Sequence, residues 1–226
     1  MSSPANEFEN TLRGSMSRLR LAITDEQIAR LRVHFEAVVE TNRAMNLTRI
    51  TDPAEAAVKH YADSLALLAW VRDHKPTIAT VLDVGTGAGF PSLPLAVMQP
   101  EWSVTAIDGT GKKIDFLRRA TQAIGLSNLA CTHANSAEWP TRERFDLVTF
   151  RALAALPRAI ERSAKFVAPG GWLIAYQTAA VVHSDLHAAE STATGHGLSS
   201  HKSYPYELCH DGGILARVLL VFHRPG

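Results

Sequence analysis

The 226-residue sequence has little cysteine, no long apolar run and no excess of charge of one sign. Its two cysteines, Cys131 and Cys209, are too far apart for a C-x-x-C redox pair or a zinc knuckle, and this usage is typical of a reduced setting. The longest apolar runs, such as residues 218–222, fall far short of the roughly 20 residues that a membrane-spanning helix needs. The opening segment contains Glu7 and Glu9 and no apolar stretch, so it does not resemble a secretory signal. We therefore expect a cytoplasmic protein without a membrane partner.

The charge is close to balanced, with 23 Lys and Arg residues, 22 Asp and Glu residues and a net charge of +1. This balance excludes a histone-like protein that binds nucleic acid by charge alone, but it allows a local basic patch. Between residues 142 and 166 basic residues outnumber acidic ones, and the basic ones are Arg142, Arg144, Arg151, Arg158, Arg162 and Lys165. Such a patch can neutralise phosphates, and a solvated helix face is the alternative for each member. The ten histidines lack metal-site spacing, so we expect no metal.

The first 75 residues have the pattern of helices. Thr24 and Gln27 have the spacing of a capping box, and apolar residues follow them at helical intervals, so a helix is predicted there. Helical patterns extend from about residue 17 to residue 70, with a break at residues 42–53, and Pro53 is well placed to begin another helix. Residues 1–75 are therefore predicted to form a helical cap, followed by a second unit formed by residues 76–226.

From residue 76 onward, short β-branched runs alternate with helical patterns. Strands are predicted at residues 79–84, 103–108, 129–133, 145–150 and 172–176, and helices at residues 91–98, 112–125 and 156–166. Strands separated by helices favour right-handed βαβ units, and hence an α/β, Rossmann-like fold with a mostly parallel sheet. Residues 204–208 and 214–222 flank a turn at Asp211, Gly212 and Gly213, and are predicted to form a hairpin.

A glycine-rich turn links the first predicted strand to the helix that Pro91 begins. Glycine stands at Gly85, Gly87 and Gly89, and Asp83 precedes the first of them by two residues. Glycines permit positive φ and a close approach of a ligand to the backbone, and a helix N-terminus offers free N–H groups, so a nucleotide-like ligand is expected. The spacing favours S-adenosylmethionine over a dinucleotide, which requires G-x-G-x-x-G, and excludes a Walker A loop. A turn that serves packing only is the alternative.

Two further segments lie at the expected carboxyl edge of the sheet. Asp108 ends the second predicted strand and is placed to accept hydrogen bonds from ribose hydroxyls, a role that both nucleotide classes share. Asn135, Ser136 and Ala137 follow the third predicted strand. They either reach the adenine of the ligand or form a solvated loop, and the residues alone favour neither.

Additional motifs surround the glycine turn. Before it stand Asn42, Asn46-Leu47-Thr48, Asp52-Pro53, Lys59-His60 and Asp63-Ser64. Within and after it stand residues 82–91, Pro94-Leu95-Ala96, Asp108, Lys112-Lys113, Phe116-Leu117-Arg118, Phe145-Asp146 and Arg151-Ala152. Together they resemble the guanine-N7 methyltransferases of small-subunit ribosomal RNA, also called glucose-inhibited division protein B. The resemblance extends over about residues 41–154, and generic methyltransferases lack the first set of motifs.

The resemblance implies S-adenosylmethionine as the methyl donor, ribosomal RNA as the acceptor, and a seven-stranded class I methyltransferase sheet with an N-terminal helical cap. Carried over position by position, it places Gly85 and Phe90 against the cofactor. It also places Ser136 and Ala137 at the adenine, and Arg151 at the cleft between cofactor and substrate.

The sequence departs from the family pattern at two positions where basic residues are usual. Asn135 stands in place of an arginine, and Gln177 stands in place of the lysine of a Leu-Lys-Gly motif. These changes concern the RNA substrate more than the cofactor. A methyltransferase with the same cofactor that acts on another RNA site or on a small molecule is therefore the second interpretation. A non-catalytic module that binds the cofactor or RNA is the third.

Guanine N7 has a lone pair and no proton, so its methylation requires no general base and depends mainly on orientation. Arg151, which follows a predicted strand directly, is the candidate for positioning substrate and cofactor. The expected cofactor-binding residues are Asp83, Gly85, Thr86, Gly87, Gly89, Phe90, Asp108, Asn135, Ser136, Ala137 and Arg151. The expected substrate-binding residues, in a protein expected to be a monomer, are Lys59, His60, Lys112, Arg119 and Arg151.

Overall fold

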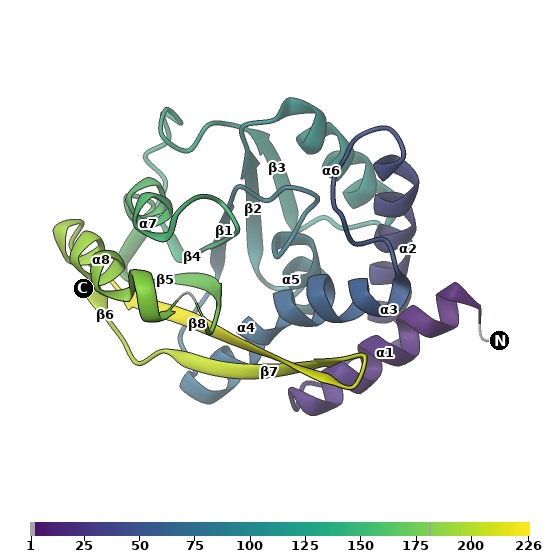
Figure 1. Ribbon diagram of the computed structural model, residues 1–226. Coiled ribbons are helices and arrows are strands. Elements are labelled where there is room, and N and C mark those ends of the chain that lie inside the picture. The colour runs from purple at the N-terminus through teal and green to yellow at the C-terminus, as the bar shows by residue number, and fades with distance from the viewer. Residues whose placement is uncertain (1–2, 181) are drawn as a thin grey trace.

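The computed structural model describes residues 3–180 and 182–226, and its N-terminal part is helical, as predicted (Figure 1). The helices there are α1 (Pro4–Arg18), α2 (Asp25–Asn42), α3 (Pro53–Ala56), the π-helix η1 (Ala57–Ala62) and α4 (Asp63–His74). The predicted capping box begins α2, because Thr24 Oγ1 accepts from the Gln27 N–H and the Gln27 side chain accepts from the Thr24 N–H.

The sequence predicted helices only from about residue 17 onward, and helix α1 corrects this prediction. The helix begins at Pro4, and Phe8, Leu12 and Met16 form an apolar stripe at intervals of four residues that is completely buried. Phe8 stacks on Phe35 of α2, with ring centroids 4.9 Å apart. The stripe contains only three residues in a polar segment, so its periodicity is weak in the sequence.

The described residues form eight strands in one sheet, in the order β3-β2-β1-β4-β5-β8-β6, with β7 also paired to β8. Their bounds are β1 (Thr80–Val84), β2 (Ser103–Asp108), β3 (Leu129–His133), β4 (Phe145–Arg151), β5 (Val167–Thr178), β6 (Ser199–Ser200), β7 (Tyr204–His210) and β8 (Gly213–His223). Strands β1 to β5 pair in parallel, and β8 is antiparallel to each of its neighbours. The parallel sheet and the C-terminal hairpin are confirmed.

The strand count is eight rather than the expected seven. Strand β6 pairs with residues 222–223 of β8 and β7 pairs with residues 213–219, while β5 pairs with residues 217–223. Because β5 occupies one edge of β8, the short strand β6 and the strand β7 share the other edge. The sheet is therefore seven positions wide, and two segments fill the last position.

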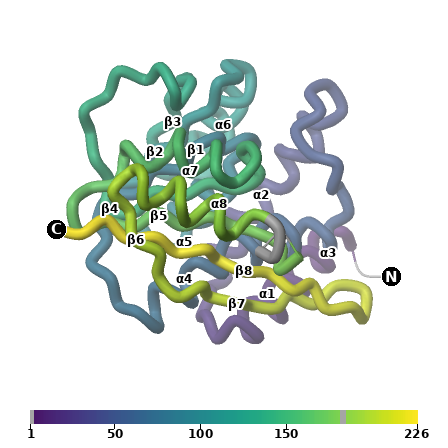
Figure 2. The backbone as a smooth tube through the Cα atoms, turned by 60° about the vertical axis from the view of Figure 1, so that its left-hand side comes forward, coloured from purple at the N-terminus to yellow at the C-terminus, as the bar shows by residue number. Residues whose placement is uncertain are grey.

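Helices cover both faces of the sheet (Figures 1 and 2). The cap, α5 (Ser92–Met98) and α6 (Gly111–Ala123) pack on one face, whereas α7 (Leu156–Ala164) and α8 (Val182–Gly195) pack on the other. Alternate strand residues point to opposite faces, so Val81 and Leu147 contact the cap side while Leu82 and Val148 contact the α7 side. Helix α8 was not predicted from the sequence. No helix in the described ranges is long and apolar enough to cross a lipid bilayer.

Candidate functional site

The glycine-rich turn connects β1 to α5 through three residues with positive φ, namely Gly85 at 77°, Gly87 at 61° and Gly89 at 101°. A Cβ on Gly87 would have no heavy atom within 4 Å, so this glycine faces open space. Gly89 instead packs against Leu117 and Leu93. The turn thus exposes bare backbone at Gly87 and is fixed to the core at Gly89.

Asp108, at the end of β2, holds the turn in place. Its Oδ2 accepts from the Gly87 N–H at 3.0 Å, and its Oδ1 accepts from the Thr110 N–H at 2.8 Å. Each carboxylate oxygen has a second lone pair and can accept a further hydrogen bond. The side chain is therefore placed to bind hydroxyl groups of a ligand that lies beside the glycine turn.

Asp83 lies in β1 behind the glycine turn and is completely buried. Its Oδ2 accepts from the Ser92 N–H at 3.2 Å, whereas its Oδ1 has no hydrogen-bond partner among the described residues. Burial raises the pKa of Asp83 to about 6. The Thr86 and Ser92 hydroxyls, 2.5 Å apart, lie next to it and tie the turn to the start of α5.

A cavity of about 330 Å³, which we call the glycine-loop cavity, opens at the carboxyl ends of β1 and β2. Its lining residues are Val84, Gly85, Ile107, Asp108, Gly109, Thr110, Ala134, Asn135, Ser136, Leu153 and Arg162. Four of the expected cofactor residues, Gly85, Asp108, Asn135 and Ser136, therefore lie together. Ala137 lines a neighbouring cavity beside α7 instead.

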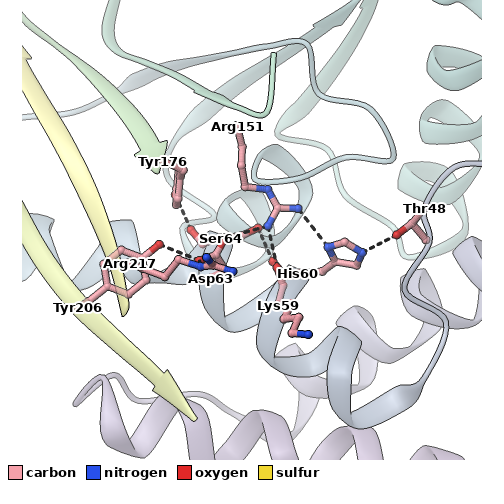
Figure 3. Close-up of polar contacts among 9 residues, drawn as sticks. All are labelled: Thr48, Lys59, His60, Asp63, Ser64, Arg151, Tyr176, Tyr206 and Arg217. Carbon is pink, nitrogen blue, oxygen red and sulfur yellow. Dashed lines mark hydrogen bonds and ion pairs between the residues drawn. The ribbon is translucent and has the colours of Figure 1, made fainter. Parts of the chain in front are cut away.

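Arg151, the last residue of β4, is held by the cap (Figure 3). Its Nη1 donates to the Lys59 carbonyl at 2.9 Å and to Asp63 Oδ2 at 3.0 Å, and its Nη2 donates to His60 Nδ1 at 3.2 Å. The guanidinium also lies 5.4 Å from the ring centroid of Phe90. The exposed fraction of the Arg151 side chain is 17%.

His60 is neutral and its tautomer is fixed by its neighbours. Because the Arg151 guanidinium offers only donors, His60 Nδ1 accepts and Nε2 carries the proton, which it donates to Thr48 Oγ1 at 2.8 Å. Burial and then the Arg151 charge lower the pKa of His60 to about 3. The imidazole stacks on Phe90, with centroids 4.6 Å apart.

The family-like motifs of the cap are one connected structure. Asn42 Oδ1 accepts from the Thr48 N–H, and the Ser64 carbonyl accepts from the buried Tyr176 hydroxyl at 2.6 Å. Lys59 and His60 lie on η1, which continues directly into α4. Such π-helical segments within a helix are frequent at functional sites.

A second cavity of about 360 Å³, which we call the Arg151 cavity, lies beside this cluster. Its lining residues are Ile50, Lys59, His60, Asp63, Arg151, Ala152, Ala154, Tyr176, Gln177, Thr178 and Arg217. Three of the expected substrate residues, Lys59, His60 and Arg151, thus lie together. Lys112 and Arg119 are exposed on α6 and line neither cavity.

Two residues of this site were not predicted from the sequence. Tyr206 donates its hydroxyl to Asp63 Oδ1 at 2.8 Å, and Arg217 Nε lies 3.5 Å from the same oxygen. Arg217 interrupts the apolar pattern of β8, which is a signal that the sequence contains. Tyr206 carries no such signal, because a tyrosine in a strand is ordinary.

Residues 152–155 separate the two cavities. Leu153 lines the glycine-loop cavity and packs directly on Gly85, where a Cβ would clash with it, whereas Ala152 and Ala154 line the Arg151 cavity. A ligand above the glycine turn can therefore present its end to a second ligand in the Arg151 cavity. The arrangement suits a transfer between two bound molecules, with hydrogen-bond donors and no free general base at the junction.

Known proteins match this chain in sequence. The profile of the GidB family, described as rRNA small subunit methyltransferase G, matches residues 27–206. A ribosomal RNA small subunit methyltransferase G from Ligilactobacillus salivarius is 38% identical over 174 residues, which are 75% of this chain and 70% of the relative. A protein of the same name from Lysinibacillus sphaericus is 33% identical over 214 residues, 93% of this chain and 88% of the relative.

Solved structures match the fold at much lower identity. M. jannaschii TYW2 in complex with AdoMet has a TM-score of 0.54 and 15% identity, with 68% of this chain and 75% of that chain covered. A putative RNA methyltransferase from Pyrococcus horikoshii has a TM-score of 0.55 and 12% identity, with 72% and 84% covered. At such identities the likeness concerns the arrangement of helices and strands only.

Proposed function

This chain belongs to the GidB family, rRNA small subunit methyltransferase G, and we propose that it methylates N7 of a guanine in small-subunit ribosomal RNA with S-adenosylmethionine as the donor. Its fold is that of the class I S-adenosylmethionine-dependent methyltransferases. The observation that carries the proposal is the junction of the glycine-loop cavity with the Arg151 cavity across residues 152–155.

The glycine-loop cavity fits S-adenosylmethionine, which when bound supplies a sulfonium methyl group for transfer. Gly87 leaves room beside the backbone, and Asp108 has free lone pairs for ribose hydroxyls. Asp83, which the sequence also placed at the cofactor, is completely buried and lines neither cavity, and its carboxylate accepts from the Ser92 N–H at the start of α5. Asn135 and Ser136 lie in the same cavity, on the loop after β3, and are the proposed adenine contacts.

The Arg151 cavity is the proposed binding site for the guanine. Of the five guanidinium N–H groups of Arg151, three donate to the cap and two remain, among the described residues, for an oxygen such as guanine O6. His60 has its Nδ1 lone pair occupied by Arg151 and does not act as a base. N7 has no proton to remove, so these residues orient the base and exclude water rather than move a proton.

Mass spectrometry of small-subunit ribosomal RNA nucleosides tests the proposal. Cells that lack this protein should lose one N7-methylguanosine, and a plasmid copy of the wild type should restore it. Unchanged N7-methylguanosine in the deletion strain overturns the proposal. In that case, methyl incorporation by purified protein into another RNA position supports a different acceptor, and none at all supports a non-catalytic module.

The same proposal includes a monomer in the cytoplasm, where ribosomal subunits are assembled. Ile214, at the start of β8, is the large apolar side chain that the described surface exposes, and its exposed fraction is 66%. A single exposed large apolar side chain among the described residues forms no extended apolar patch, which supports a monomer. Sedimentation at equilibrium checks the monomer.

A further inference from the structure

Helix α7 carries a line of basic side chains that the methyl-transfer site does not require. Arg158, Arg162 and Lys165 follow one another at intervals of four and three residues, so they lie on one face of the helix and its end. The opposite face, which includes Leu156 and Ile160, is buried against the sheet. The three cations thus point away from the core together.

These cations border a cavity of about 420 Å³ that Ala137, Glu161 and His196 also line. We call Arg158, Arg162, Lys165 and His196 the α7 basic surface. Arg162 lines the glycine-loop cavity as well, together with Asn135. The α7 basic surface therefore begins at the edge of the proposed cofactor site and extends along α7 away from it.

The cations of α7 differ from those of the cap in their partners. On the cap, Arg13 pairs with Asp25, and Arg30 pairs with Glu26 at 2.8 Å. Among the described side chains, no carboxylate lies within 4.0 Å of a charged nitrogen of Arg158, Arg162 or Lys165. Glu161 is the one acidic side chain that lines the cavity. Lys165 Nζ donates to the Ala137 carbonyl at 3.0 Å and lies over the ring of Phe166, but neither contact neutralises its charge. A row of cations without carboxylate partners is complementary to a row of phosphates.

We propose that the α7 basic surface binds the phosphodiester backbone of the ribosomal RNA that flanks the target guanine. The inference rests on the proposed function, because it requires a nucleotide at the junction of the two cavities. With the guanine in the Arg151 cavity, the adjoining strand passes the edge that Arg162 shares with the glycine-loop cavity and continues along α7. Phosphate contacts there fix the register of the RNA without reading its sequence.

The salt dependence of RNA binding tests this surface directly. We would measure the Kd of the full chain for a small-subunit ribosomal RNA transcript between low and physiological salt. The double variant Arg158→Ala with Lys165→Ala removes two cations that do not line the glycine-loop cavity. It should reduce the slope of log Kd against log salt by about 1.5, since each phosphate contact contributes about 0.7–0.9, and weaken binding about 10-fold. Affinity for S-adenosylhomocysteine should not change.

Two matched variants separate this role from a loss of folding or of total charge. Arg13→Ala with Arg30→Ala removes two paired cations from the cap and should leave the slope unchanged. Glu161→Lys converts the carboxylate of the α7 cavity to a cation and should increase the slope and tighten binding, which a misfolded protein would not do.

The outcomes distinguish this inference from the proposed function. A double variant with an unchanged salt slope overturns the inference, whereas loss of N7-methylguanosine in deletion cells would still support the function. Weaker binding to whole small subunits but not to the bare transcript would assign the surface to a ribosomal protein, and also overturns it. A reduced slope for the transcript supports RNA binding by α7 even if the methylated position differs.

Discussion

The glycine-loop cavity and the Arg151 cavity adjoin, yet they are built in opposite ways. The first consists largely of backbone and small side chains from the ends of β1 and β2, held by Asp108. The second consists of charged and aromatic side chains from the cap, β4, β5 and β8, held around Asp63 and Arg151. The site proposed for the cofactor is formed largely by backbone, whereas the site proposed for the guanine is formed by side chains.

The two cavities also differ in electrostatics. Behind the glycine turn, burial raises the pKa of Asp83 to about 6, so its charge is disfavoured. On the cap side, burial lowers the pKa of His60 to about 3 and that of His34 to about 4, so both imidazoles stay neutral. The cap nevertheless buries the ion pair of Arg151 with Asp63, which makes it the region more sensitive to loss of one partner.

The largest effect is expected from Gly87→Asp, which acts on the glycine-loop cavity alone. The new carboxylate would occupy the open space beside the turn and repel Asp108, whose Oδ2 is 3.0 Å from the Gly87 nitrogen. We expect at least a 100-fold loss of affinity for S-adenosylhomocysteine by calorimetry, about 2.7 kcal/mol, with the fold retained because Asp tolerates positive φ.

Gly212→Asp is the matched control for that variant. Gly212 also has a positive φ, 71°, and open space where a Cβ would lie, but it is in the turn between β7 and β8. The Gly212→Asp variant should introduce the same backbone strain as Gly87→Asp and leave the affinity for S-adenosylhomocysteine unchanged. Equal affinities of the Gly87 variant and wild type would contradict the assignment of the glycine-loop cavity to the cofactor.

The sequence predicted the strand, the glycine-rich turn and the helix beside the glycine-loop cavity because their determinants are local. A strand, three alternating glycines, a proline at the start of a helix and an acidic residue at the next strand end suffice to define them. The bounds of β2 and β3 agree with the prediction residue for residue. Three expected cofactor residues lie elsewhere, because the Phe90 ring packs on His60 at the cap side, Arg151 lines the Arg151 cavity and Ala137 lines the cavity beside α7.

The next effect concerns the Arg151 cavity. Arg151→Met would leave the 8%-exposed Asp63 carboxylate without its main partner, and we expect a loss of about 3 kcal/mol in unfolding free energy. Methyl transfer should fall at least 100-fold. Urea denaturation and single-turnover transfer to small subunits measure the two effects, and cofactor affinity should change much less.

Adding Asp63→Asn to Arg151→Met separates stability from positioning. The double variant removes the uncompensated charge, so it should regain most of the stability while transfer stays low. Recovery of transfer together with stability would show that Arg151 acts only by supporting the cap, and that the proposed contact with the guanine is wrong.

The Arg151 cavity was predicted less completely, for a physical reason. Lys59, His60 and Arg151 came from a family resemblance and a strand end, but their mutual contacts span about ninety residues of sequence. The partners Tyr206 and Arg217 come from the C-terminal hairpin, and only tertiary packing brings them to Asp63. Helices α1 and α8 were not predicted for a similar reason. Each buries an amphipathic stripe of only two to four small or scattered apolar residues, which is a weak signal in the sequence until the packing partners of the helix are known.

The last two predictions concern pH, and the stability contributions of Asp83 and His60 should change with pH in opposite directions. Asp83 has a folded pKa near 6, above its ordinary 3.8, so it destabilises the fold progressively from about pH 4 to pH 6 and fully above that. Asp83→Asn should therefore raise the unfolding free energy at neutral pH, by up to about 3 kcal/mol, and not at pH 4.

His60 has a folded pKa of about 3, below its ordinary 6.5, so it lowers stability as the pH falls below about 6.5, because only the unfolded state takes up the proton. His60→Gln can accept from Arg151 and donate to Thr48 as the imidazole does, and it removes this loss. We expect the variant to match wild type at pH 7.5 and to exceed it by about 2.7 kcal/mol at pH 4.5. Urea denaturation of wild type and both variants at neutral and at acidic pH measures these differences in unfolding free energy. A stability gain of Asp83→Asn that grows as the pH falls, or a gain of His60→Gln that grows as the pH rises, would contradict the electrostatic contrast between the two regions.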